Sequence, residues 1–98
     1  MEFKDKKDVL IKNGNHLLSF VKKKNFGMEI IQDVMDERYI EELKAWFKDA
    51  EEFVEFYGLE CHKERFKASS WIINQDERVS LERIKNILNI IERIMNKQ

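Results

Sequence analysis

The residues that could support catalysis or metal binding are few and scattered along the chain. The single cysteine, Cys61, is followed directly by His62, and the only other histidine, His16, lies far earlier in the sequence. Adjacent residues point to different sides of a helix, whereas metal ligands must converge on one point. Ser69 and Ser70 lack a histidine placed with an orienting acid, as a nucleophile would require. We therefore expect a buried thiol at Cys61, a partly exposed His62, and no catalytic residue, metal ion or cofactor.

Three carboxylates have a spacing that could contribute to a metal site. Glu37, Glu41 and Glu42 resemble one half of the carboxylate magnesium site of helical pyrophosphohydrolases. Such a site needs a second acidic pair from a facing helix. The glutamates further along the same segment lie outside its core stripe and cannot supply that pair. A helical enzyme that handles nucleotides or metal, with an acidic cleft formed between chains, therefore stays an alternative function.

The net charge is only −1, but the charges are unevenly placed. Residues 1–25 contain seven lysines and three acids, residues 26–60 eleven acids and three bases, and residues 61–98 eight bases and five acids. This favours an acidic central helix between basic neighbours in one bundle, with an acidic binding face as the alternative. The pI of about 6.1 and the acidic centre argue against nucleic acid as a partner.

Length and composition favour one helical domain over residues 1–98. The chain has no proline, three glycines and a single cysteine, so it cannot form an internal disulfide. The charged start of the sequence lacks the apolar run of a signal peptide. No segment approaches the ~20 apolar residues that cross a bilayer. We predict a cytoplasmic protein without a membrane partner.

The strongest helical pattern runs from Asp36 to Tyr57. Asp36 is the expected N-cap, and Gly58 the expected left-handed C-cap. Steps of three and four separate the apolar residues, as on a helix face turned to a core: Tyr39, Ile40, Leu43, Trp46, Phe47, Ala50, Phe53, Val54 and Tyr57.

A first helix is predicted from Phe3 to Lys24. Gly14 lies on its apolar stripe, where glycine costs up to ~1 kcal/mol relative to alanine. We interpret it as a notch that admits a large side chain, with Trp46 as the candidate. The alternative is a break in the helix at residues 13–15. Val9 lies off the stripe with Phe20, which suggests a contact with a further helix or another chain.

The remaining segments complete an all-α antiparallel bundle of about four helices with short connections. Met28 to Met35 is expected as a short helix, residues 60–74 as another, and residues 74–78 as a loop. Ser80 is the expected N-cap of a last helix, with Val79 as its hydrophobic staple. The predicted core comprises Leu10, Leu17, Val21, Leu43, Trp46, Phe47, Phe53, Phe66, Ile73, Ile84, Leu88 and Ile91.

Two stretches together resemble a known kind of module. They are VLIKNGNHLL at residues 9–18, and LKAWFKDAEEFV at residues 43–54 with Tyr57, Gly58 and Phe66 after it. The pairing is similar to the small helical modules attached to effector domains in bacterial and phage-defence proteins. The resemblance covers about two thirds of the chain and implies a linker or interaction element rather than a catalytic one.

The last helix has a wider apolar face than one core contact needs, from Leu81 to Met95. Either it packs between two neighbours, or one flank meets another molecule. The candidate interface residues are Ile87, Ile90, Ile94, Phe20 and Phe56. The favoured function is a non-enzymatic interaction or regulatory module, as a homodimer or with a protein partner, linked to phage defence. A phage-side inhibitor acting through its acidic face is a further alternative.

Overall fold

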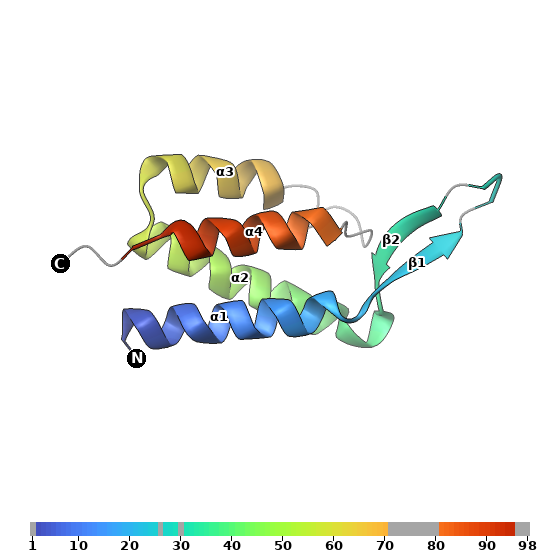
Figure 1. Ribbon diagram of the computed structural model, residues 1–98, viewed down its shortest axis with the longest axis horizontal. Helices are drawn as coiled ribbons and strands as arrows, with labels where there is room; N and C mark the ends of the chain where they lie inside the picture. Colours follow the sequence, from blue (N-terminus) through green and yellow to red (C-terminus); the bar gives the residue numbers. More distant parts are fainter. Residues whose placement is uncertain (1, 26, 30, 71–80, 96–98) are drawn as a thin grey trace.

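The computed structural model describes residues 2–25, 27–29, 31–70 and 81–95. Within these ranges the chain forms four helices and a two-stranded antiparallel sheet (Figure 1). In chain order the elements are α1 (Phe3–Leu18), β1 (Val21–Asn25), β2 (Ile31–Met35), the short 3-10 helix η1 (Glu37–Tyr39), α2 (Ile40–Tyr57), α3 (Glu60–Ser70) and α4 (Leu81–Arg93).

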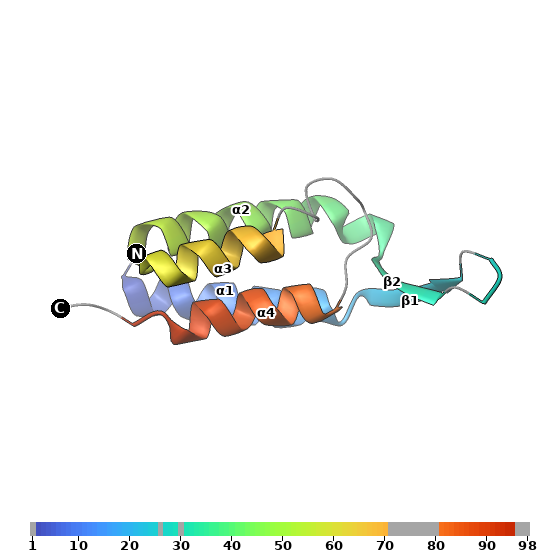
Figure 2. The ribbon, with the colours of Figure 1, turned by 90° about the horizontal axis from the view of Figure 1, so that it is seen from above.

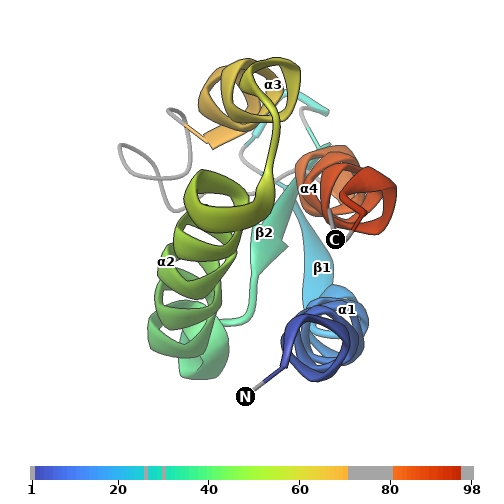
Figure 3. The same cartoon turned by 90° about the vertical axis from the view of Figure 1, so that its left-hand side faces the viewer.

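The helices form an antiparallel bundle, as the sequence predicts. Successive helices alternate in direction along the long axis, so that α1 begins and α4 ends at the same end (Figure 1). Helix α1 packs against α2 and α4, and α3 packs against the same two helices from the other side (Figure 3). None of the described helices is long and apolar enough to cross a membrane.

The strands β1 and β2 correct the all-α expectation. The first helix ends at Leu18 rather than Lys24, and residues 31–35 are a strand rather than part of a helix. Val21 pairs with Met35 and Asn25 with Ile31, so the two strands form a hairpin, here called the ribbon. The ribbon extends beyond the helices along the long axis of the molecule (Figures 1 and 2).

Local interactions explain why α1 stops where it does. The backbone N–H and the hydroxyl of Ser19 both donate to the carbonyl oxygen of His16, which tightens the last turn. The Phe20 ring then stacks on Tyr39, with 3.7 Å between ring centroids, and this contact draws the chain off the helix axis. Val21 follows, and its branched side chain favours an extended backbone.

The predicted core is largely confirmed. Of its twelve members Val21 is only half-buried, Ile73 lies outside the described residues, and the other ten are buried. The structure adds Met35, which joins the base of the ribbon to the core cluster, while Val34 is buried outside that cluster. Two further expectations, the N-cap at Ser80 and the loop at residues 74–78, also fall outside the described residues.

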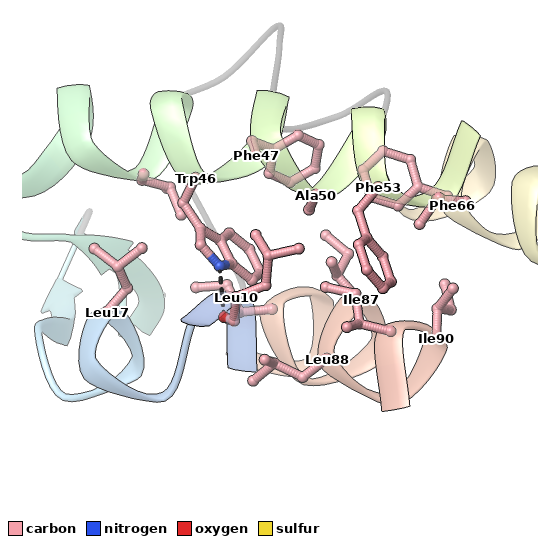
Figure 4. Packing of buried hydrophobic residues seen from close by; sticks show 14 of the residues in the cluster. Leu10, Leu17, Trp46, Phe47, Ala50, Phe53, Phe66, Ile87, Leu88 and Ile90 are labelled. Atoms are coloured by element: carbon pink, nitrogen blue, oxygen red, sulfur yellow. Dashed lines mark hydrogen bonds between the residues drawn. The ribbon is translucent and has the colours of Figure 1, made fainter. Parts of the chain in front are cut away.

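The notch at Gly14 is confirmed, and α1 continues unbroken through residues 13–15. A Cβ atom at Gly14 would lie 2.6 Å from Leu88 Cδ2 and 2.7 Å from Trp46 Cζ2. The buried indole Nε1 of Trp46 donates to the carbonyl oxygen of Leu10 at 2.9 Å (Figure 4). The glycine therefore lets α1 and α2 approach closely, and the hydrogen bond fixes the indole in the gap.

The two ends of α2 agree only in part with the capping residues predicted from the sequence. The Asp36 carboxylate accepts the backbone N–H of Arg38, which confirms it as an N-cap, although the first turn is the 3-10 helix η1. Gly58 is extended (φ −80°, ψ 155°), so the predicted left-handed cap is wrong. Glycine is favoured there because a side chain would not fit: a Cβ would lie 2.5 Å from the carbonyl oxygen of Val54.

Candidate interaction groove

The three isoleucines predicted at an interface lie in the core. Ile87, Ile90 and Ile94 are 0%, 5% and 0% exposed. Figure 4 shows Ile87 and Ile90 among the buried residues contributed by the other helices. The spare flank expected on the last helix is therefore not at the surface, because α4 packs against α1, α2 and α3. Its wide apolar face corresponds to the first of the two alternatives, a helix between neighbours.

The two aromatic candidates differ from each other. Phe20 is half-buried between Tyr39, on which it stacks, and His16, whose ring meets it edge-on at 4.9 Å between centroids. Phe56 is 79% exposed and touches the Tyr57 ring edge-on at 4.7 Å. Of the five predicted interface residues, only Phe56 presents most of its side chain to a partner.

Phe56 stands at the rim of a hollow between α1 and α2. This hollow has a volume of about 430 Å³, and a second one of about 260 Å³ continues it toward the ribbon. Asp49 lines both, so we treat them as one feature, the α1/α2 groove. Its lining consists of Lys6, Val9, Leu10, Asn13, His16 and Leu17 from α1, and Glu42, Ala45, Trp46, Asp49, Glu52, Phe53, Phe56 and Tyr57 from α2.

The end of the groove away from the ribbon has an apolar floor, and the charged Lys6, Asp49 and Glu52 also line it. Leu10 and Phe53 are buried at 7% and 4% exposure and form its floor. Val9, 44% exposed, and Phe56 stand at its rim. Phe53 is held by Phe3, with ring centroids 5.5 Å apart, so this end of the groove is preformed. A preformed apolar surface with an aromatic side chain at its rim is typical of a binding site for a protein segment.

Acidic side chains from α2 line one wall of the groove. Glu42, Asp49 and Glu52 fall on the groove side of the helix, at steps that are typical of one helical face. None of the three forms an ion pair with another residue in the part of the chain that the structure describes. Lys6 and His16 stand on the α1 wall, at opposite ends. The groove can therefore attract cations along α2 while it buries apolar groups at its far end.

The residues considered as metal ligands do not converge in the described part of the chain, and the side chains of Ser69 and Ser70 lie outside it. Cys61 is exposed, so the expectation of a buried thiol is wrong. The half-buried His62 accepts the backbone N–H of Leu59 at Nδ1, at 3.0 Å, and thus caps the start of α3. Among the described residues, no group of three or more His, Cys, Asp or Glu side chains is placed to hold a metal.

Asp36 joins the base of the ribbon to the central helix. Its carboxylate takes two hydrogen bonds from the Arg38 guanidinium, from Nε at 3.2 Å and from Nη2 at 2.9 Å. These bonds, followed by the bond from the Arg38 backbone N–H, lower the pKa of Asp36 to about 2. The Asp36 backbone N–H donates to the carbonyl oxygen of Phe20. The junction therefore holds the two chain segments at the base of the ribbon together.

Comparisons with protein families, with curated proteins and with solved structures find no match to this chain.

Proposed function

We propose that this chain is a non-enzymatic interaction module that binds a protein segment in the α1/α2 groove. The observation that carries the proposal is Phe56, which is 79% exposed at the rim of a preformed apolar hollow. Exposed aromatic residues beside a pocket are frequent centres of binding energy in protein interfaces. The acidic α2 wall gives the site a preference for a segment with cationic groups.

The resemblance of residues 9–18 and 43–54 to modules attached to effector domains supports the same class of function. Both stretches contribute side chains to the groove: Val9 and Asn13 from the first, Ala45 and Asp49 from the second. Phage defence is the biological setting that the resemblance suggests, with this chain as the binding element rather than the catalytic one.

Affinity capture with a single surface variant tests this function. The wild-type chain, immobilised as bait, is used to capture proteins from a lysate of the cells in which it is naturally made, and a differently tagged copy of the chain is added to the lysate. The Phe56→Ser variant should no longer capture the proteins that the wild-type bait captures. We expect binding to weaken about thirtyfold, as for a central aromatic residue of an interface. Met95→Ser is the matched control, because Met95 is 76% exposed and does not line the groove.

The control variant should capture the same proteins as the wild type. Both substitutions are on the surface, so both variants should melt close to the wild-type temperature. Identical capture by all three proteins would show that the groove is not the binding site, and the proposed function would then be wrong.

A further inference from the structure

The α1/α2 groove lies on an open side of the helical bundle. Figure 3 looks along the bundle and shows α3 and α4 on the same side of the pair formed by α1 and α2. On α1, Lys7 and Gly14 face α4, because Lys7 binds carbonyl oxygens near the end of α4 and Gly14 lies close to Leu88. Lys6 and Asn13, each one residue earlier, line the groove instead. The groove therefore opens away from α4, and among the described residues only α1 and α2 line it.

The floor of the groove runs along both helices rather than across them. Its buried side chains are Leu10 and Leu17 from α1, and Trp46 and Phe53 from α2. The members of each pair are seven residues apart, which is close to two helical turns. Apolar residues that repeat every seven positions in neighbouring helices form the kind of surface along which a further helix packs.

The walls of the groove favour a helix over an extended segment. The backbone N–H and C=O groups in the middle of α1 and α2 are bonded within those helices, so they offer no row of partners to a strand. An extended segment on this apolar floor would bury backbone groups without hydrogen bonds, which is costly. A helix satisfies its own backbone groups and presents only side chains to the floor.

The charges of the two walls differ. On the α2 wall, Glu42 and Asp49 are also seven residues apart, and Glu52 lies further along it. None of these acids is ion-paired with another described residue. The α1 wall contains Lys6 and His16 and no acid. A helix in the groove would therefore be complementary if it placed cations two turns apart on the flank that faces α2, whichever way it runs.

We propose that the α1/α2 groove binds an amphipathic helix of a partner protein, with two lysine or arginine residues seven positions apart on one flank. The inference rests on the proposed function and names the form and charge of the bound segment. The α1 wall from Lys6 to His16 spans about 15 Å, so the bound helix has about three turns. Its apolar face lies on the floor, and the exposed side chains of Val9 and Phe56 cover that face at the rim.

Selection from a peptide library tests the form of the bound segment. Random peptides of about four helical turns are displayed on yeast cells, and those that bind the wild-type chain but not Phe56→Ser are sequenced and synthesised. We expect apolar residues at steps of three and four, and two cationic residues seven positions apart. Circular dichroism should show that each peptide gains helix when it binds. Met95→Ser is the matched control and should bind the same peptides as the wild type.

Reversal of the acids tests the charge of the bound segment. The variant Glu42→Lys with Asp49→Lys should bind the selected peptides about tenfold more weakly or worse. Peptides whose two cations are exchanged for glutamate should instead prefer this variant to the wild type. The matched control is Glu51→Lys with Glu55→Lys, which changes the net charge equally at two exposed acids of α2 outside the groove. At about 0.15 M salt, where distant charges are screened, the control should bind the original peptides within about twofold of the wild type.

Three results would overturn the inference: peptides that bind without gaining helix, peptides that bind the reversed variant as well as they bind the control, or no peptide whose binding depends on Phe56. A wild-type dimer that Phe56→Ser converts to a monomer, measured by light scattering, would assign the groove to a second copy and would also overturn it. If Phe56→Ser still abolishes capture from the lysate, the proposed function stands and only this inference is wrong. If neither capture nor peptide binding depends on Phe56, both are wrong.

Discussion

At Gly14 the space that a methyl group would need is filled by side chains of two other helices. Alanine there would improve the helix propensity of α1 by up to ~1 kcal/mol. Its Cβ would also press on the Trp46 indole, which cannot yield easily because its Nε1 is bound to the Leu10 carbonyl. Overpacking of this kind costs roughly 1–3 kcal/mol. We therefore expect Gly14→Ala to lower the free energy of unfolding, measured by urea denaturation.

Asn15→Ala provides the control, because Asn15 is the exposed neighbour of Gly14 on the same helix. It gains the same kind of helix propensity without a clash, so its stability should equal or slightly exceed that of the wild type. A stabilised Gly14→Ala protein would contradict the close contact between α1 and the indole. The glycine shows how far a sequence can specify a contact, since its place on an apolar stripe predicted the notch and its occupant.

The junction between the ribbon and α2 should make stability depend on pH. The Asp36 carboxyl has its pKa lowered to about 2 by Arg38, against an ordinary value of 3.8. A carboxyl with a lowered pKa in the folded state stabilises it above the unfolded-state pKa, and this contribution is lost as pH falls through the folded-state value. Asp36→Asn keeps an N-cap side chain but removes the charge. Its deficit in melting temperature relative to the wild type should therefore be largest above about pH 4 and shrink toward pH 2. A deficit that stays constant over this range would contradict the assigned ion pair.

The elements were predictable where one periodicity is sustained. Eighteen residues of α2 repeat an apolar stripe at steps of three and four, and only a helix fits such a run. The ribbon escaped prediction because Met28, Ile31 and Met35 fit a helical face, whereas β2 shows no alternation of apolar and polar residues. Its polar residues Gln32 and Asp33 fall on opposite faces, and the consecutive Val34 and Met35 are both buried. The sequence does predict a turn at residues 26–27, but as a connection between helices rather than between two strands. After Gly27, both Met28 and Glu29 have positive φ, at 47° and 64°, which residues other than glycine rarely adopt.

The groove is a property of the whole molecule, and the sequence indicated only its rim. Val9 lies off the apolar stripe of its helix, and Phe56 was among the predicted interface residues. The other lining residues are individually ordinary, and the hollow arises from the packing of α1 against α2. For the last helix the sequence indicated a surface that the structure does not have. Its wide apolar face is buried, because α4 packs against α1, α2 and α3. A wide apolar face in a sequence therefore does not by itself distinguish a central helix from a dimer interface.

The first turns of α1 are tied to the end of α4 by Lys7. Its Nζ donates to the carbonyl oxygens of Glu92 at 2.8 Å and Ile94 at 2.9 Å, across more than eighty residues of sequence. These carbonyls lie at the negative end of α4, where a cation is favourable. Lys7→Met keeps most of the side-chain length but removes the ammonium group. The two carbonyls can still bind water, so the expected loss of stability is about 1 kcal/mol.

For a domain of this size, that loss lowers the melting temperature by about 4–8 °C. Lys4→Met is the matched control, because Lys4 is an exposed lysine in the first turn of the same helix. It should melt within a degree or two of the wild type. Equal melting temperatures for the two variants would mean that the bundle holds its ends together through the apolar core alone. A selective loss in Lys7→Met would show that a single cation closes the bundle where its first and last helices meet.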